Sequence, residues 1–328
     1  MPSPHRYSED ELIARIFAPI AGPAGLGLAD DAALLPTSRE PLVATTDMLV
    51  AGVHFFADDP PGAIARKALR VNLSDLAAKA AEPVGFLLSI ALPPDWTNDW
   101  LEAFAAGLAE DARVFSCPLV GGDTSATPGP LAVSIAAFGR AAEGRFVARS
   151  GARPGDAVYV SGTIGDAALG LALRRDPDLA ARLSKTSREH LLDRYLLPRP
   201  RLDLAPLLRE CASAAMDVSD GLAGDLAKLA RASGAGAVVE IDYVPLSDAA
   251  REAIALDPAL FETAVTGGDD YEILVCAGQA AALPERAAAL GIAPPAKIGE
   301  IVAGTAVPIF RGADGFALHF NKLSHSHF

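Results

Sequence analysis

Short acidic stretches, each punctuated by Gly, Ser or Thr, are the feature that most constrains how this chain can fold. Several of them follow apolar runs, where an acid beside Gly or Thr predicts that a strand gives way to a turn. The pattern therefore predicts a fold of strands and helices in which acids gather at strand ends. The acids are Asp30, Asp31, Asp47, Asp75, Asp123, Asp217 and Asp220.

Carboxylates brought together at strand ends repel one another, so gathering them is unfavourable without cations. Hard divalent cations such as Mg²⁺ remove this repulsion and prefer oxygen ligands of this type. Acid clusters of this kind often hold a phosphorylated substrate through metal. The pattern favours a metal-assisted enzyme of phosphate chemistry.

Length and composition predict a buried globular protein of two domains. The chain has 328 residues, too many for one ordinary core. Hydrophobic residues make up 51% and charged residues 21%, which argues against disorder.

The charge balance narrows the possible partners. A net charge of −13 and a pI near 4.9 disfavour nucleic acid and anionic membranes. Cys117, Cys211 and Cys276 are scattered, which predicts reduced thiols and no disulfide framework. The first residues lack an apolar signal segment, and Val84 to Leu92, the longest apolar stretch, is too short to span a bilayer. We expect a cytoplasmic protein.

Periodicity predicts alternating strands and helices along the whole chain, in an α/β or mixed α+β fold. A Gly- and Arg-rich segment, 139–155, marks the expected boundary between a domain at 1–145 and a second at 146–328. The predicted strands include 32–35, 42–46, 86–92, 131–138, 157–161, 238–241, 273–276 and 298–302. The predicted helices include one that Ser8 caps and others at 64–81, 100–115, 162–174 and 222–232.

The common nucleotide-binding signatures are absent. The chain has no G-x-x-x-x-G-K-[ST], no G-x-G-x-x-G between a strand and a helix, and no kinase catalytic loop. Each acidic stretch also has an ordinary structural reading. Asp220 could cap a helix, and Gly121-Gly122-Asp123 could form a turn. His54 could be a half-buried histidine with satisfied hydrogen bonds that does not act as a ligand.

Taken in order, however, the stretches resemble the thiamine-monophosphate kinase family almost from end to end. The matching motifs are A-D-D-A-A-L, T-T-D-M-L-V-A-G-V-H-F, N-L-S-D-L-A-A, G-G-D-T, R-S-G-A-R-P-G-D, S-G-T-I-G-D, D-V-S-D-G-L and T-G-G-D-D-Y-E. The wider superfamily includes aminoimidazole ribonucleotide synthetase, selenophosphate synthetase and a hydrogenase-maturation enzyme.

The resemblance implies an N-terminal α/β domain that dimerises through its sheet and a C-terminal α/β domain packed against it. It also implies ATP and several Mg²⁺ ions in a cleft between acidic loops, and thiamine monophosphate as the phosphoryl acceptor. The implied metal ligands are Asp30, Thr45, Thr46, Asp47, Asp75, Asp123, Asp217 and Asp220. The implied ATP contacts are Gly122, Asp123, Arg149 and Ser219, and the implied substrate contacts are His54, Asp269 and His325.

Two positions depart from the family pattern. Asp269 stands where the family usually has Glu in Gly-Gly-Glu-Asp-Tyr-Glu, so the side chain implied to touch thiamine is one methylene shorter. The aromatic residue that packs on the substrate in the family falls at or near His325, in the tail L-S-H-S-H-F.

The chemistry implied by the resemblance is direct in-line transfer of the ATP γ-phosphoryl group, with no catalytic acid or base. Two rivals remain open: another ATP-dependent synthetase of the superfamily, and a metal-binding dimerisation protein without activity. Residues 1–30 lack the cysteine of a selenophosphate synthetase, and the chain ends without the cysteine of the hydrogenase-maturation enzyme.

Overall fold

The computed structural model describes residues 7–28, 39–142, 145–304 and 307–324, and within them the chain forms two compact units. The first comprises residues up to Leu76 together with Ala81–Gly144. The second comprises Arg145–Phe328 together with Ala77–Ala80, the last residues of a long helix and the turn after it. Asp30, Asp31, His325 and the predicted strand at 32–35 lie outside the described residues.

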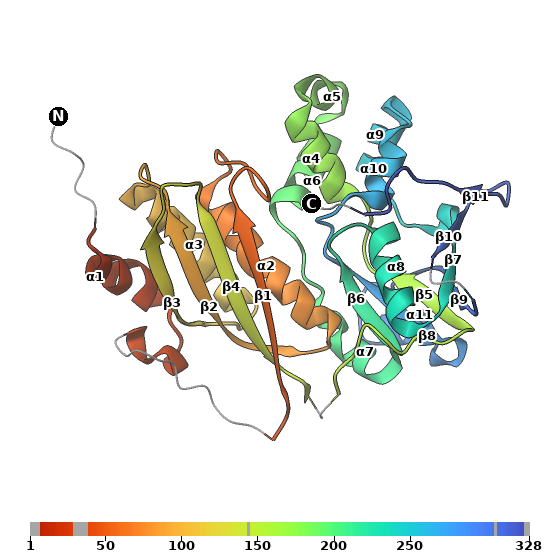
Figure 1. The fold of residues 1–328 in the computed structure, drawn as a ribbon, viewed down its shortest axis with the longest axis horizontal. Helices are drawn as coiled ribbons and strands as arrows, with labels where there is room; N and C mark the ends of the chain where they lie inside the picture. Colours follow the sequence, from red (N-terminus) through yellow and green to blue (C-terminus); the bar gives the residue numbers. More distant parts are fainter. Residues whose placement is uncertain (1–6, 29–38, 143–144, 305–306, 325–328) are drawn as a thin grey trace. The chain divides into compact units, whose positions relative to one another are not determined.

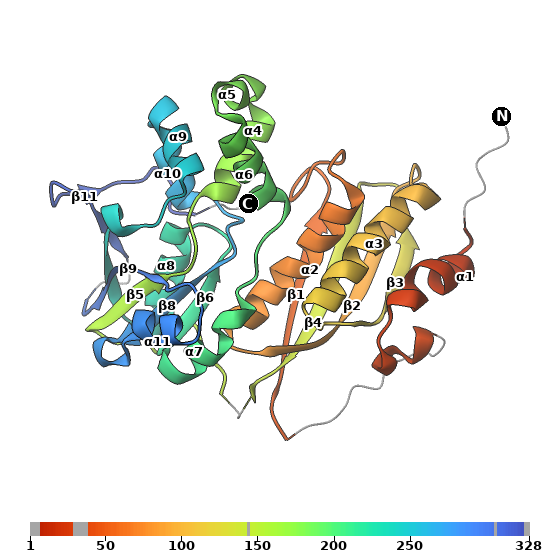
Figure 2. The same cartoon turned by 180° about the vertical axis from the view of Figure 1, so that it is seen from behind.

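The first unit is a four-stranded sheet in the order β1-β4-β2-β3, with one face covered by two helices (Figures 1 and 2). β1 and β2 each run antiparallel to β4, and β3 runs parallel to β2. Its elements are α1 (Glu9–Leu12), β1 (Leu42–Val50), α2 (Pro61–Ala78), β2 (Glu82–Leu92), α3 (Asn98–Val114), β3 (Leu119–Ala126) and β4 (Ala132–Arg140).

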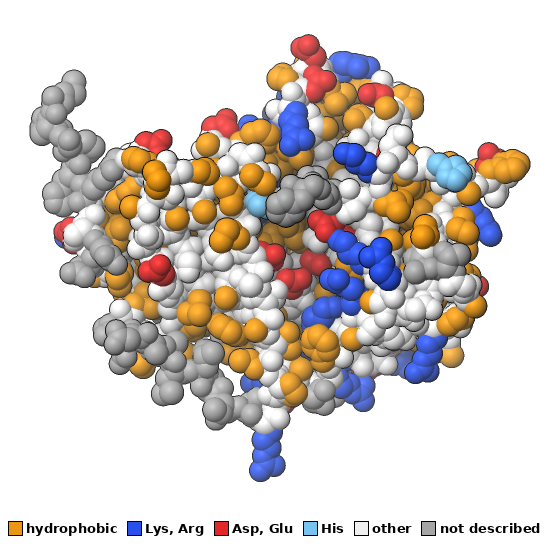
Figure 3. Space-filling model, in the orientation of Figure 1, with side chains coloured by type: hydrophobic (Ala, Val, Ile, Leu, Met, Phe, Trp, Pro, Cys, Tyr) orange, Lys and Arg blue, Asp and Glu red, His pale blue; other side chains and the backbone are white. Residues whose placement is uncertain are grey.

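Alternation along the strands decides which face is buried. On β4, Val133, Ile135 and Ala137 are fully buried, whereas the residues between them are half-buried. On the helices that cover this face, residues such as Leu73 of α2 and Phe104 of α3 are also fully buried (Figure 2). Figure 3 shows hydrophobic side chains scattered among polar ones on the other face, which α2 and α3 do not cover.

Capping side chains mark the starts of the first helix and of α3. Ser8 and Glu11 form the expected reciprocal cap, because Ser8 N donates to Glu11 Oε2 (3.0 Å) and Glu11 N donates to Ser8 Oγ (3.4 Å). Thr97 caps α3 by accepting from Trp100 N at 3.2 Å.

The second unit contains a seven-stranded sheet in the order β11-β10-β7-β9-β5-β8-β6. Its strands are β5 (Asp156–Val160), β6 (Ala214–Val218), β7 (Gly236–Glu240), β8 (Glu272–Gly278), β9 (Ala296–Val302), β10 (Ile309–Arg311) and β11 (Ala317–Leu318). Its helices are α4 (Asp166–Arg175), α5 (Pro177–Arg182), α6 (Lys185–Leu196), α7 (Ala205–Cys211), α8 (Leu222–Ser233), α9 (Asp248–Leu256), α10 (Leu260–Thr266) and α11 (Leu283–Ala289).

Both faces of this sheet carry a hydrophobic core around β5, β8 and β6. One core joins Met216 and Leu274 to α8 through residues such as Leu226. The other joins Tyr159 and Val275 to α7, α11 and the end of α2. A third cluster holds α4, α5, α6, α9 and α10 together, in the green and light-blue group of Figure 1. The mixed α/β fold of the sequence prediction is confirmed.

Several element bounds differ from the prediction. β1 does not end at Thr46 but continues to Val50, and the predicted helix 64–81 occupies Pro61–Ala78. The helix expected from Gly162 begins only at Asp166, after a glycine turn. All three cysteines are free, as predicted. Within the described ranges, no helix is both long and apolar enough to cross a membrane.

Candidate active site

In the first unit the described candidate metal ligands lie within regular strands and a helix, not at strand ends. Asp47 lies inside β1 and Asp123 inside β3, so the predicted strand-to-turn position is wrong for both. β1 and β3 are the two edge strands of this sheet. An edge strand leaves one side of its backbone unpaired and tolerates polar residues that a central strand would exclude.

The register of β1 separates the threonines of the T-T-D motif. Thr45 and Asp47 pair with Ala137 and Ile135 of β4, two fully buried residues, and therefore point to the helix-covered face. Thr45 Oγ1 donates to the Asp75 carboxylate on α2. Thr45, Asp47 and Asp75 therefore share one face.

Thr46 lies on the opposite face, where its Oγ1 donates to the carbonyl of Ile135 at 3.0 Å. Asp123 is exposed, and it pairs with exposed Ser89 in register. Ser89 in turn pairs with Ser134 and so lies on the face without helices. The structure does not bring Thr46 or Asp123 to Asp75 within one chain.

Gly122 lies within β3, and His54 lies in the turn after β1. A Cβ added at Gly122 would lie 1.9 Å from the carbonyl oxygen of Leu88, so only glycine fits there. His54 follows β1, and its Nδ1 accepts from Val50 N at 3.0 Å. In the neutral ring, Nε2 therefore carries the hydrogen.

In the second unit, four of the candidate residues gather at one end of the sheet: Asp217, Ser219, Asp220 and Asp269. Asp217 is buried within β6, and Ser219 and Asp220 follow its last residue. β8 starts beside this end, because Val218 pairs with Glu272. The turn before β8, residues 267–271, carries Asp269. Ser219, Asp220 and Asp269 therefore lie in two loops that touch. The predicted strand-end position is confirmed for Asp220, whereas Asp217 lies inside β6.

Backbone contacts hold the two loops together. Asp269 N donates to Ser219 O at 2.9 Å, and Tyr271 N donates to Val218 O at 2.8 Å. A Cβ on Gly268 would lie 2.3 Å from Ser219 O, so this close approach requires glycine. Asp269 and Tyr271 have positive φ angles of 74° and 51°, which are strained for residues with side chains. Strain of this kind persists only where the surroundings impose it.

Two buried acids impose that conformation. The Asp270 carboxylate accepts from Gly165 N (2.7 Å) and Ala167 N (3.2 Å) at the start of α4. Burial raises the pKa of Asp270 well above its usual range, although these two hydrogen bonds oppose the rise. Glu272 is fully buried and accepts from Arg194 (2.8 Å), Arg201 (2.6 and 2.7 Å) and Ser161 (2.6 Å).

Asp220 has a cation from its own chain. Lys228 of α8 donates to the Asp220 carboxylate and, at 2.7 Å, to Asp225 Oδ1. Asp225 is fully buried, and its other oxygen accepts from Asp220 N at 2.8 Å. Burial raises the pKa of Asp225 despite its bond to Lys228.

Arg149 is exposed and lies beside β6. The preceding residue, Ala148, accepts a hydrogen bond at 3.0 Å from Ala215 N, within β6. This contact places the Arg149 backbone along the edge strand that carries Asp217. A guanidinium here could contact an anionic ligand.

The donor set suits Mg²⁺ by its chemistry, because every candidate ligand offers carboxylate or hydroxyl oxygen. Among the residues that the structure describes, no three His, Cys, Asp or Glu side chains gather as a ready metal cage. Each unit, taken by itself, therefore offers oxygen donors of the kind that Mg²⁺ prefers.

Sequence reasoning missed the residues that support the second group. Lys228, Asp225, Asp270, Glu272, Arg194 and Arg201 received no role from it. Asp270 and Glu272 belong to the T-G-G-D-D-Y-E motif, and a helical spacing of three places Asp225 beside Lys228. No local pattern brings Arg194 and Arg201 to Glu272, because that contact joins distant segments.

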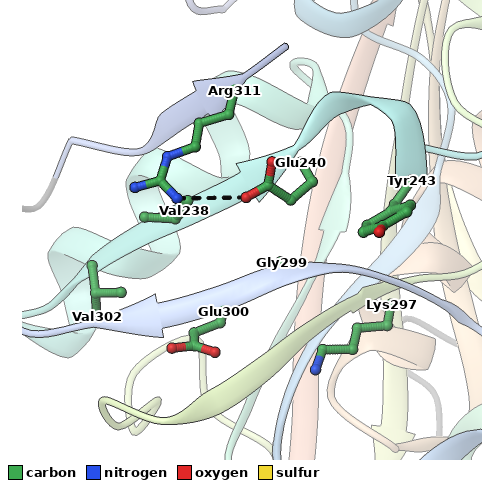
Figure 4. A pocket seen from close by; sticks show the side chains of 8 residues that line it. All are labelled: Val238, Glu240, Tyr243, Lys297, Gly299, Glu300, Val302 and Arg311. Carbon is green, nitrogen blue, oxygen red and sulfur yellow. Dashed lines mark ion pairs between the residues drawn. The ribbon is translucent and has the colours of Figure 1, made fainter. Parts of the chain in front are cut away.

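The candidate residues do not line the groove on β7, β9 and β10 (Figure 4). This groove, of about 660 Å³, includes Val238, Gly299 and Tyr243, and the Arg311–Glu240 ion pair (3.6 Å) crosses two of its strands. It lies on the part of the sheet farthest from β6. We assign it no part in the candidate site.

The chain resembles known proteins along most of its length. Residues 29–141 match the N-terminal domain of AIR synthase related proteins, and residues 153–310 match the C-terminal domain. Thiamine-monophosphate kinase of Caulobacter vibrioides is 44% identical over 94% of this chain and 88% of its own length.

Solved structures agree with this relation. Thiamine-monophosphate kinase from Stenotrophomonas maltophilia superposes with a TM-score of 0.79 at 40% identity, covering 89% of this chain and 91% of its own. AaThiL, solved with AMPPCP and TMP, gives a TM-score of 0.78 at 29% identity over 97% and 94% of the two chains. With its two domains, its motifs and these relatives, the chain belongs to the thiamine-monophosphate kinase family.

Proposed function

We propose that this protein transfers the γ-phosphoryl group of ATP to thiamine monophosphate, giving thiamine diphosphate and ADP, the last step in making that cofactor. The observation that carries the proposal is the 44% identity to a thiamine-monophosphate kinase over nearly the whole chain. The relative solved with AMPPCP, an ATP analogue, and TMP supports ATP and thiamine monophosphate as the two substrates.

The acceptor chemistry requires no general base. A phosphate monoester has a second pKa near ~6, so roughly nine-tenths of it is dianionic at pH 7 and already nucleophilic. The reaction needs two polyanions held in line, against a repulsion of ~4 kcal/mol per pair of unit charges at ~4 Å. Mg²⁺, when bound, would supply positive charge that offsets this repulsion and stabilises the charge of the transition state.

The residues of this chain then act by binding and orienting. Asp30, Thr45, Thr46, Asp47, Asp75, Asp123, Asp217 and Asp220 are the proposed metal ligands. We propose Gly122, Asp123, Arg149 and Ser219 as ATP contacts, and His54, Asp269 and His325 as contacts to thiamine monophosphate. The locked turn around Asp269 supports its role, because a strained conformation held by buried acids keeps the carboxylate in one place.

We propose direct transfer without a phosphorylated enzyme. Incubation with γ-³²P-labelled ATP alone should leave the protein unlabelled after denaturation. Stoichiometric label on a side chain would overturn the direct mechanism, whatever the final product.

The decisive assay offers the purified protein Mg-ATP with either thiamine monophosphate or unphosphorylated thiamine and resolves the products as thiochromes. Thiamine diphosphate should form from the monophosphate only, and only with Mg²⁺. ATP consumption without thiamine diphosphate, in the presence of another acceptor, would move the activity to a sister synthetase. No ATP turnover with any acceptor would favour a binding protein.

We also propose a homodimer formed through the uncovered face of the first sheet. That face presents Met48 (59% exposed), together with half-buried Phe138 and Ala136, beside exposed Ser89. A sheet face of four strands can supply the ~800 Å² per partner that stable interfaces bury. Asp123 lies on this face, so dimerisation would bring it to a second copy.

Met48→Glu should break the dimer, because a carboxylate would be buried against the partner sheet. Light scattering at micromolar concentration should give two chain masses for the wild type and one for the variant. Val114→Glu, at a similarly exposed position (55%) on α3, should remain dimeric. A monomeric wild type would contradict the proposal.

The three free thiols further support a reducing compartment, and we propose the cytoplasm.

A further inference from the structure

Lys228 stands beside a residue that the proposed function assigns to a metal ion. Its ammonium group contacts the Asp220 carboxylate and Asp225 Oδ1, the latter at 2.7 Å. Asp225 also accepts from Asp220 N at 2.8 Å. The lysine and the buried acid therefore hold both the backbone and the side chain of Asp220.

The three charged side chains differ in how much they are exposed to solvent. Asp225 is fully buried, Lys228 is 33% exposed and Asp220 is 37% exposed. A lysine side chain is charged at neutral pH, so its ammonium group offsets one of the two carboxylates.

The position of Lys228 restricts what Asp220 can bind. One Asp220 oxygen, Oδ2, is occupied by the ammonium group. A divalent cation that uses this oxygen must displace the lysine, and one that uses the other oxygen is repelled by it. Either way the positive charge of the lysine opposes binding of a cation to Asp220.

We propose that Lys228 is an internal counter-cation that positions Asp220 and competes with a divalent cation for its carboxylate. The inference rests on the assignment of Asp220 as a metal ligand in the proposed function. It makes Lys228 a residue that sets how much Mg²⁺ the enzyme needs. On cation binding, the ammonium group keeps Asp225 as its partner, so the buried acid does not lose its counter-charge.

The test is calorimetric titration of the nucleotide-free protein with Mg²⁺, and with Mn²⁺ followed by electron paramagnetic resonance. Lys228→Met should bind the cation at the Asp220 site about tenfold more tightly, because a neighbouring positive charge is gone. Lys228→Arg keeps the charge and should stay within about twofold of the wild type. Lys185→Met removes a lysine from an exposed ion pair on α6 and should change nothing.

A second variant guards against misfolding, since Lys228→Met leaves Asp225 buried without its lysine. Lys228→Met combined with Asp225→Asn removes both charges and keeps an oxygen to accept from Asp220 N. It should also bind the cation more tightly than Asp225→Asn alone. Unchanged or weaker cation binding in both Lys228→Met variants would overturn the proposal.

These titrations contain neither ATP nor thiamine monophosphate, so they remain informative if the thiochrome assay fails. Tighter cation binding without kinase activity would keep the role of Lys228 and reject the proposed reaction. Kinase activity with unchanged cation binding would keep the reaction and reject the role of Lys228.

Discussion

The two units place their candidate residues by different physical means. In the first, β1 and α2 hold Thr45, Asp47 and Asp75 through regular strand register and one side-chain contact. In the second, the corresponding residues lie in loops that buried acids and glycine contacts hold in place. Regular elements can place a ligand by alternation alone, whereas a loop needs tertiary partners to become equally rigid.

The largest expected effect compares one carboxylate from each unit. Asp47→Asn and Asp220→Asn should each reduce turnover at least ~100-fold, because each removes a proposed ligand charge. The fold should remain, since neither side chain is fully buried. Steady-state rates at millimolar Mg²⁺, with circular dichroism as a check on folding, measure both.

Asp242→Asn is the matched control, because Asp242 is exposed on a short turn of the second unit and has no proposed role. Its rate should equal that of the wild type. If Asp47→Asn kept a near-normal rate while Asp220→Asn did not, only the loop-held unit would carry metal ligands.

The next effect concerns the charges that hold the loops of the second unit. Glu272→Gln should destabilise this unit by about 3–5 kcal/mol, because it leaves buried Arg194 and neighbouring Arg201 without their carboxylate. Urea unfolding followed by fluorescence and by limited proteolysis measures the loss. Glu189→Gln, from an exposed pair with Lys185, should cost no more than ~0.5 kcal/mol. If both variants lost the same free energy of unfolding, the buried network of Glu272 would not support the loops.

A smaller effect is the pH dependence that Asp270 contributes. Because its pKa is raised in the folded protein, the native state binds this proton more tightly than the unfolded chain. The stability that the proton confers is complete below the unfolded pKa of ~3.9 and is lost as pH rises to the folded pKa. At most, this group lowers the free energy of unfolding by about 1.4 kcal/mol for each pH unit of increase.

Asp270→Asn should remove this part of the slope, although it also weakens one of the two hydrogen bonds to α4. Urea unfolding of both proteins from pH 4.5 to 7 gives the difference in slope. A wild type whose stability rises with pH more steeply than that of the variant would show that the carboxylate is stabilised by its two N–H donors more than burial disfavours it.

Much of the fold could be predicted because it depends on local patterns. Apolar alternation marks β4, a reciprocal cap marks the helix at Ser8, and the D-V-S-D-G-L stretch marks a strand, a turn and a helix. The strand-to-turn rule succeeded at Asp220, where β6 does end. It failed at Asp47 and Asp123, because edge strands accept acids that a local rule assigns to turns.

The sequence by itself determined the alternation of strands and helices, the acidic motifs and, through them, the family. These depend on residues close together in the chain, whose spacing is readable without a structure. Only the tertiary structure decided that Thr45 meets Asp75 on α2, and that Glu272 joins Arg194 and Arg201. Strand register and the pairing of buried charges are set by segments distant in sequence, because the free energy of burial selects them only when the whole unit packs.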